Sequence, residues 1–508
     1  MVSQRLFGAT ALALALAGLA GCKVGPDYKT PASPRAASFT TSAATASLAN
    51  QPVANKPVAS QPVAEAINPD WWNLFKDPEL SHLESQVAAA NLDVATATIR
   101  VAESRSQQKI VSSAELPAIN GDASVSTQRI SPRGVFSMFP SGGNQNGATG
   151  VGAGGLSLAP FTLYQYGFDA SWELDLWGKV RRGTEAAAAQ HEAAEYDRRD
   201  ALLSALAEVA RDYIDLRGVQ ADLRLAQRNL ALSKQKLVLI NQRAGAGLSS
   251  QIDVDNATAD VGNAEAQIPT LLDHQAQMIN RLSFLLGETP GALAPELSDA
   301  RPVPPVPPRV PVGVPSELAQ RRPDIRAASA NLHAATAAIG MAKADFYPSI
   351  SLTGSLDLQA LKLKDLGNWG ARTFAAGPTL SLPIFEGGKL VAQLHLREQE
   401  QQEAAVNYQR TVLSAWHEVD NALNSYRAEQ TRRDQLQKSL AAQQKSVKLA
   451  QSEFDQGLID GIDLMNAQQQ LVAAQQQFDD STTNVSTNLV SLYKALGGGW
   501  EANGPHKG

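Results

Sequence analysis

The chain has 508 residues but only one cysteine, Cys22, and aromatic residues make up only 6% of it. A single cysteine excludes a disulfide framework and any metal or redox site built from several thiolates. Positive charge is not in excess either, because 44 lysines and arginines stand against 50 aspartates and glutamates, giving a net charge of −6. A nucleic-acid-binding protein needs a basic surface, so we expect no nucleic-acid partner.

The motifs of common catalytic sites are missing as well. The seven histidines are scattered without HExxH or other metal-ligand spacing, and the chain has no Walker A motif and no GxSxG sequence. Residues 150–155 match GxGxxG, but they precede a predicted strand instead of following one, which favours a flexible loop over a dinucleotide site. We therefore expect no enzyme activity, no metal and no cofactor.

The apolar run at the start of the chain, residues 9–20, is too short to span a bilayer as a helix. Arg5 precedes this run and Leu-Ala-Gly-Cys22 ends it, which predicts a signal peptide over residues 1–21 and a bacterial lipobox. Cys22 would then be the acylated first residue of the mature chain. Lipoproteins that stay at the inner membrane typically carry Asp at the next position, so Lys23 favours the outer membrane. The alternative is an ordinary signal peptide with an incidental cysteine.

Long stretches suited to helix dominate the rest of the sequence. Residues 389–456 contain no glycine and no proline, which allows a single helix of 68 residues, ~100 Å long at 1.5 Å per residue. Residues 184–243 form a second such stretch, interrupted only by Gly218. Apolar residues recur in both at coiled-coil spacing, and glycine-containing turns follow at 244–251 and 455–461. Two long helical hairpins are therefore predicted.

The two hairpins belong to an internal duplication. The motif Gly247-Leu248-x-x-x-Ile252-Asp253 recurs 210 residues later as Gly457-Leu458-x-x-x-Ile462-Asp463, and further pairs align at the same offset. A stretch at 29–69 repeats the motif Pro-Val-Ala, and proline every five residues excludes helix, so an extended tether is expected.

The predicted organisation follows from these boundaries. It consists of a signal peptide (1–21), a lipidated N-terminus with a Pro-rich tether (22–70), a first repeat (71–300), a Pro-rich connector (301–315), a second repeat (316–500) and a short tail (501–508). The first repeat opens with a predicted helical segment from about residue 78 to residue 115 and carries a Gly-rich insertion at 142–155.

Four segments alternate between apolar and small polar residues, as β-strands with two different faces do. The alternation is strong in 164–175 and 349–359 and weaker in 119–128 and 374–385. Their length suits transmembrane strands around a wet lumen. A half-buried soluble sheet also alternates and is the alternative.

Four strands cannot close a barrel by themselves, and an open sheet edge in lipid leaves costly unpaired backbone groups. If the strands span a membrane, several copies must combine them. Two copies give eight strands with a filled interior, and three give twelve, the smallest assembly with room for a channel. The sequence favours a homotrimer without excluding other numbers.

With these features in place, the chain resembles the TolC-like outer membrane factors, in particular their lipoprotein branch of NodT type. The resemblance rests on four motifs: Gly21-Cys22-Lys-Val-Gly-Pro-Asp-Tyr28, Trp71-Trp72-x-x-Phe75-x-Asp77-Pro78, Arg321-Arg322-Pro323-Asp324-Ile325, and Leu492-Tyr493-Lys494-Ala495-Leu496 with the glycines that follow. It implies a mainly α-helical fold with membrane β-structure, in which a trimeric 12-stranded outer-membrane β-barrel is continued by a long periplasmic α-helical barrel. It further implies a periplasmic adaptor protein and an inner-membrane pump as partners.

The resemblance also suggests functional residues at the hairpin turns. The turns at 243–250 and 456–460 resemble the tips that meet the adaptor, with contacts expected at Arg243, Gly247, Leu248, Gly457 and Leu458. The alternative is that the glycines only permit the chain to reverse.

After each turn, family members often carry an Asp-x-x-Asp-Ala pattern whose acids form a ring at the closed periplasmic aperture. Asp253 and Asp463 match the first acid, whereas the second is replaced by Asn256 and Asn466. In a trimer Asp463 would recur three times around one axis, and such a ring favours cations. Stabilisation of the helix N-terminus is the competing explanation for both aspartates.

The expected function is that of a passive channel in a tripartite efflux system, which exports small molecules while partners supply the energy. The competing class is a lipid-anchored periplasmic adaptor or a coiled-coil structural lipoprotein, and an anchored enzyme is a distant third.

Overall fold

The computed structural model describes residues 23–31, 61–63, 69–129, 160–307, 309–311 and 321–499. The predicted signal peptide, Cys22, the Gly-rich segment 142–155 and the tail 501–508 lie outside these residues, as do most of the tether and part of the connector. The chain divides into two compact units. We call them the strand unit (residues 1–28, 106–188 and 333–402) and the hairpin unit (residues 29–105, 189–332 and 403–508).

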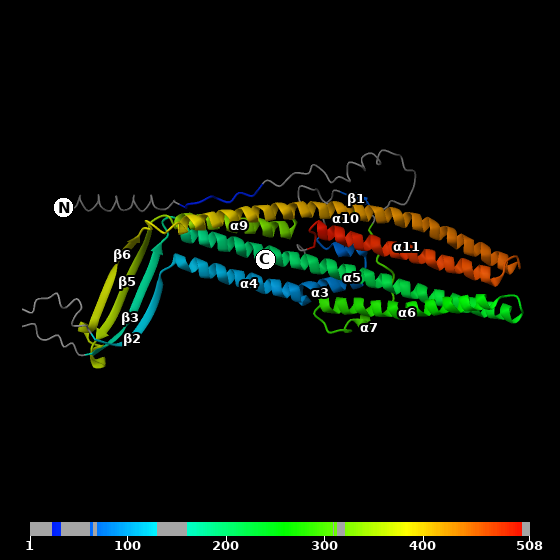
Figure 1. Cartoon of the computed structure of the whole chain (residues 1–508), viewed down its shortest axis with the longest axis horizontal. Helices are drawn as coiled ribbons and strands as arrows, with labels where there is room; N and C mark the ends of the chain where they lie inside the picture. Colours follow the sequence, from blue (N-terminus) through cyan, green and yellow to red (C-terminus); the bar gives the residue numbers. More distant parts are fainter. Residues whose placement is uncertain are drawn as a thin grey trace, which may run out of the picture. The chain divides into compact units, whose positions relative to one another are not determined.

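The strand unit contains a four-stranded antiparallel sheet (Figure 1). Its strands are β2 (Ala118–Gln128), β3 (Phe161–Leu174), β5 (Ser349–Ala360) and β6 (Arg372–Ser381), in the order β2-β3-β5-β6. All four segments that alternate in the sequence are therefore strands, and β3 and β5 pair directly although they lie on opposite sides of the connector.

The register of the sheet gathers the apolar residues of all four strands on one face. Val125 stands opposite Tyr164, Phe168 opposite Leu356, and Leu356 opposite Phe374. Directly paired residues in antiparallel strands point to the same side of a sheet. The other face carries small and polar side chains, and there Asn120 donates a hydrogen bond to Asp169 at 3.2 Å.

The two longest helices, α5 (Lys179–Gly245) and α10 (Lys389–Asp455), have 67 residues each. Each is followed by a helix of 35 residues, α6 (Gln251–Leu285) or α11 (Gly461–Ala495), so both predicted hairpins are present. Helix α5 begins earlier than residue 184, the predicted start. The cause is Asp175, whose carboxylate accepts hydrogen bonds from the amides of Val180 and Arg181 at 3.1 and 2.9 Å.

The helical segment predicted from 78 to 115 is interrupted at Asn91. It forms α3 (Pro78–Ala90), α4 (Leu92–Ser112) and a 3-10 turn, η2 (Ser113–Glu115). The side-chain oxygen of Asn91 accepts hydrogen bonds from the amides of Asp93 and Val94, and its amide group donates to the carbonyl of Leu285 at 2.9 Å. Asn91 thus caps α4 while it ties the break to α6.

The remaining described elements are short, apart from one helix. They are β1 (Gln61–Val63), η1 (Trp71–Phe75), α7 (Ala294–Leu297), β4 (Arg309–Pro311), α9 (Pro323–Ala344), η5 (Leu363–Asp365) and η6 (Trp369–Ala371). Strands β1 and β4 pair in parallel, so part of the predicted tether is bound to the Pro-rich connector. Within the described residues, no helix is both long and apolar enough to cross a membrane.

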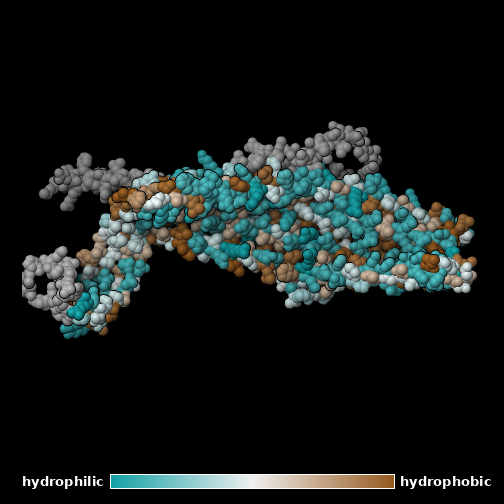
Figure 2. All heavy atoms as spheres, in the orientation of Figure 1, coloured by the Kyte–Doolittle hydropathy of each residue, from teal (hydrophilic) through white to brown (hydrophobic). Residues whose placement is uncertain are grey.

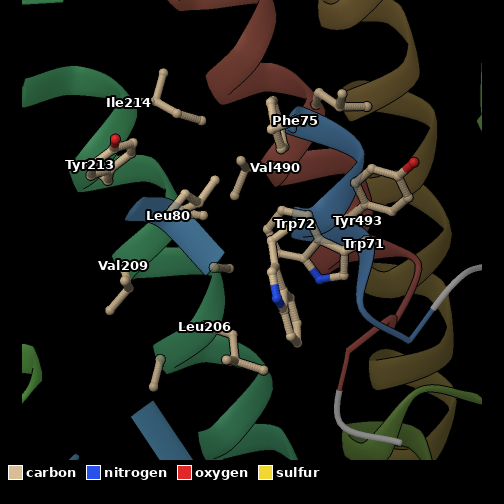
Figure 3. Packing of buried hydrophobic residues seen from close by; sticks show 14 of the residues in the cluster. Trp71, Trp72, Phe75, Leu80, Leu206, Val209, Tyr213, Ile214, Val490 and Tyr493 are labelled. Carbon is tan, nitrogen blue, oxygen red and sulfur yellow. The ribbon is translucent and has the colours of Figure 1, made fainter. Parts of the chain in front are cut away.

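The core of the hairpin unit forms where η1 and α3 meet the long helices (Figure 3). Trp71 and Phe75 are fully buried, and Trp71 stacks on Tyr493 of α11 with ring centroids 5.2 Å apart. Asp77 caps α3 through the amides of residues 79 and 80 and also accepts a hydrogen bond from Tyr213 of α5 at 2.9 Å. The Trp-Trp-x-x-Phe-x-Asp-Pro motif therefore begins α3 and fixes it to both hairpins.

One buried carboxyl group in α3 has no hydrogen-bond partner among the described residues. It belongs to Glu84, which is 0% exposed and whose two carboxylate oxygens both lack a partner there. Burial raises the pKa of Glu84 well above its usual value of 4.5, because the charged form loses its hydration. At pH values between the usual pKa and the raised one, the folded chain therefore holds a proton on Glu84 that the unfolded chain releases.

Since the folded-state pKa of Glu84 is the higher one, stability falls as pH rises from about 4.5 towards that raised pKa. We expect Glu84→Met to raise the free energy of unfolding by about 1–3 kcal/mol at neutral pH, because a buried carboxyl without a partner is removed. Unfolding followed at pH 5 and pH 8 measures both effects, and the variant should lose less stability between the two pH values.

The exposed Glu103, changed to Met, is the control and should leave the pH dependence of the free energy of unfolding as it is. If both variants showed the same pH dependence of unfolding, the raised pKa would not belong to Glu84.

Candidate functional site at the hairpin turns

The two hairpins reverse through turns of the same construction. Gly247 and Gly457 have backbone φ angles of +80° and +72°, a region that side chains with a Cβ rarely adopt. The amide of Leu248 donates to the carbonyl of Arg243 at 2.8 Å, and that of Leu458 donates to the carbonyl of Glu453 at 2.9 Å. These hydrogen bonds close the last turns of α5 and α10, so glycine at both positions has a structural role.

Large apolar side chains are exposed at these turns. Leu248, Ile252 and Leu458 are each 70% exposed in the single chain. Figure 2 shows hydrophobic residues among hydrophilic ones at the end of the hairpins where the turns lie. Exposed apolar residues that cluster in this way are typical of a surface that contacts another protein.

The two aspartates predicted at the gate differ in their local bonding. Asp253 forms a capping box with Ser250: its carboxylate accepts from the Ser250 amide at 2.9 Å, and its own amide donates to the Ser250 hydroxyl at 3.2 Å. The hydrogen bond from the Ser250 amide, followed by one that the Ser250 hydroxyl donates to the same carboxylate at 2.8 Å, lowers the pKa of Asp253. In the second hairpin Asp460 is the cap and accepts from the amides of Ile462 and Asp463, both at 2.9 Å. Asp463 is therefore not needed as the cap, and its side chain is exposed.

An ion pair joins the two turns. The guanidinium of Arg243, at the end of α5, donates to the carboxylate of Asp460 at the start of α11. The hydrogen bond from the Asp463 amide, followed by the bond from Arg243, lowers the pKa of Asp460. The carboxylate of Asp460 thus stabilises α11 and binds the other hairpin at the same time.

A shallow pocket of about 380 Å³ lies beside this ion pair, between the first turns of α6 and α11. Asp253, Asn256 and Asn466 line it together with Arg243 and Leu248. The structure thus brings three of the four predicted gate residues together with two predicted tip residues. Gly457 and Leu458 lie in the second turn, and Asp463 is exposed one helical turn after Asp460.

Sequence reasoning included Asp460 only as the end of the turn 456–460 and missed its capping role and its bond to Arg243. A signal was present, because Asp460 occupies the position that corresponds to Ser250 at the offset of 210, and both residue types are preferred helix caps. In the described part of the chain, no group of three or more His, Cys, Asp or Glu side chains is placed to hold a metal ion.

Comparison with known proteins identifies the family. The sequence profile of the outer membrane efflux proteins matches residues 83–288 and 314–498. The chain belongs to the outer membrane efflux protein family. This confirms the expected relation to TolC-like outer membrane factors, places the protein in the outer membrane as an efflux channel, and confirms that it is not an enzyme.

Relatives of this efflux protein match it along almost its whole length. Outer membrane protein OprJ of Pseudomonas aeruginosa is 32% identical over 504 residues, which cover 97% of this chain and 96% of OprJ. The solvent efflux pump outer membrane protein SrpC of Pseudomonas putida is 31% identical over 496 residues, with coverage of 96% and 98%.

Solved structures of outer-membrane channels resemble this efflux protein as well. The channel OprN superposes with a TM-score of 0.80 at 30% identity, covering 94% of this chain and all of OprN (100%). The open state of the MtrE channel of Neisseria gonorrhoeae superposes with a TM-score of 0.74 at 28% identity, covering 94% and 99% of the two chains.

The ion pair between the turns should restrain both hairpin ends. An exposed pair contributes about 0.2–1 kcal/mol, so Arg243→Met should speed amide hydrogen exchange over residues 456–463 by about 1.4- to fivefold. Exchange measured by mass spectrometry on the intact protein checks this. Arg228→Met, which removes an exposed arginine from the same helix, is the matched control and should leave the turn unchanged. The assigned pair is wrong if both variants behave like the unaltered protein.

Proposed function

We propose that the chain, acylated at Cys22, assembles as a homotrimer with a 12-stranded barrel in the outer membrane and a helical barrel in the periplasm. Docked to a periplasmic adaptor and an inner-membrane pump, the trimer acts as a passive conduit for small molecules. The observation that carries this proposal is the two-faced sheet with its free edges.

The sheet supports assembly through its edges. In the described chain, β2 and β6 each pair with only one neighbour. The apolar face carries exposed Phe168, Leu356 and Phe374, which are 63%, 50% and 81% exposed and suit contact with lipid. Unpaired edge groups in lipid cost several kcal/mol each, and joining β2 of one copy to β6 of the next removes every edge. Three copies give twelve strands and a lumen lined by the polar face.

The helices support an internally duplicated architecture. The bounds of α5 and α6 each differ by 210 residues from those of α10 and α11, as the sequence repeats do. Three copies then contribute six hairpins of two types, which is twelve helical positions around a common axis. This count matches that of the strands.

The turns support docking to partners. Exposed Leu248 and Leu458 provide an apolar surface at both hairpin ends, and these ends carry the predicted adaptor contacts. Relatives such as SrpC are named as outer membrane components of efflux pumps, which supports a pump and an adaptor as partners of this chain. Contact with the adaptor would compete with the Arg243–Asp460 pair and separate the hairpins, a two-state change in packing.

The gate is assigned to the residues after the turns. Asp253 is occupied as a capping residue, whereas the exposed Asp463 is free to contribute its charge to a ring in the trimer. Asn256 and Asn466 would add hydrogen-bonding groups but no charge. The ring would therefore carry one acid from each second hairpin, and Asp463 is the principal gate residue.

The assembly is tested by native mass spectrometry of the detergent-extracted protein. We expect three subunits, each lacking residues 1–21 and carrying acyl mass. An acylated monomer would overturn the channel architecture and favour a lipid-anchored adaptor instead. A trimer without acyl mass would retain the channel and reject Cys22 as the anchor.

The gate is tested by conductance in planar bilayers. Asp463→Ala should raise single-channel conductance and reduce preference for cations, because three negative charges leave the constriction. Asp434→Ala removes the same charge from an exposed site on α10, away from the turn, and should change neither quantity. Equal conductance of the Asp463 variant and the unaltered channel would remove Asp463 from the gate.

A further inference from the structure

The segment that follows Cys22 is bound tightly to the strand unit. The amide of Val24 donates to the carbonyl of Trp177 at 3.1 Å. The guanidinium of Arg182, on α5, donates to the carbonyl oxygens of Val24 and Gly25 at 3.1 and 3.3 Å and to the carboxylate of Asp27 at 2.8 Å. Arg182 is only 1% exposed, so these three acceptors satisfy a buried cation.

Glu185, one turn further along α5, completes the charge network. Its carboxylate accepts from Arg182 at 2.9 Å, binds the ammonium of Lys23 and contacts the ring of His333 on α9 at 3.0 Å. Burial raises the pKa of Glu185, but the bonds from Lys23, His333 and Arg182 outweigh it and lower the pKa to about 2. The ring of Tyr28 stacks on His333 with centroids 4.6 Å apart, which holds the other end of the segment.

The backbone of the segment also fits its site closely. Gly25 has a φ angle of +95°, and a Cβ at this residue would lie 2.5 Å from the Cα of Gly340 on α9. A side chain at Gly340 would in turn collide with the Arg182 side chain at 2.8 Å. Residues 23–28 and the two helices α5 and α9 therefore fit together closely. Gly25 and Gly340 leave room for the backbone of the segment to lie directly against α9.

We propose that residues 23–28 occupy a dedicated docking site on α5 and α9, and that Arg182 and Glu185 are positioning residues that fix where the lipid anchor leaves the protein. This inference rests on the proposed acylation of Cys22. The residue next to the anchor is then held by the unit that contains the membrane strands. The Pro-rich stretch 29–69 follows the docked segment, so it separates that segment from Trp71 and does not separate the anchor from the protein.

Trypsin cleavage of the full-length mature protein in detergent tests the docking. Lys23 and Lys29 are both potential cleavage sites, but only Lys23 lies inside the docked segment. Loss of the buried charge-assisted bonds should speed initial cleavage after Lys23 by about tenfold or more in Arg182→Met. Asp27→Asn removes one charge on the segment itself, where the side chain is 82% exposed, and should give a smaller increase because the other acceptors of Arg182 remain.

Arg181→Met is the matched control, because Arg181 is the neighbouring residue of the same type but binds Asp175 instead of the segment. It should leave cleavage after Lys23 unchanged, and cleavage after Lys29 serves as the internal reference in every variant. Equal cleavage after Lys23 in the unaltered, Arg182 and Asp27 proteins would overturn the docking site. So would the same acceleration in the Arg181 control.

The mass of the released N-terminal peptide separates the two proposals. Slow cleavage after Lys23 together with acyl mass on Cys22 supports both. Slow cleavage without acyl mass rejects the lipid anchor and the positioning role with it, while the docking site itself stands.

Discussion

The two edges of the four-stranded sheet, β2 and β6, which have no further partner strand among the described residues, are the constraint on which the proposed architecture depends. In water, β2 and β6 could be solvated, but next to hydrocarbon every backbone group needs a partner within the protein. In the proposed barrel, the apolar face formed by Phe168, Leu356 and their neighbours would lie against lipid, where unpaired edges cost the most. Within the proposed trimer, each chain supplies an incomplete wall that only other copies can complete.

The duplicated hairpins show how equivalent positions can diverge while the fold is kept. Ser250 caps the first hairpin with the help of Asp253, whereas Asp460 at the corresponding position caps the second alone. A charged cap in the second copy lets the chain form an ion pair with Arg243 from the first. It also releases Asp463 from the capping role, so that the two halves have the same fold but different charge distributions at their ends.

Local pattern was sufficient to predict the strands and hairpins, because alternation and the absence of Gly and Pro act on neighbouring residues. Features that depend on residues far away in the sequence could not be predicted in this way. Asn91 interrupts a helix-compatible segment because the carbonyl of Leu285 binds it. Gly218 does not interrupt α5, since the small residue faces Thr483 of α11, where a Cβ would lie 2.9 Å from the threonine side chain. The candidate gate residues follow from the positions of the turns in the sequence, but the pairing of Arg243 with Asp460 depends on how the two hairpins pack.

The distribution of burial along the hairpins favours the turns as the place where the proposed channel opens. Side chains around Trp71, Tyr213 and Tyr493 are fully buried, and separating them would cost several kcal/mol for each large residue. Along α10 the last buried residue is Leu440, so the final turns before residue 455 depend on partly exposed contacts. Beyond them, the exposed ion pair at the turns contributes at most about 1 kcal/mol. A partner that binds the apolar turn residues can therefore part the hairpin ends at small cost, while the aromatic core keeps the helices assembled.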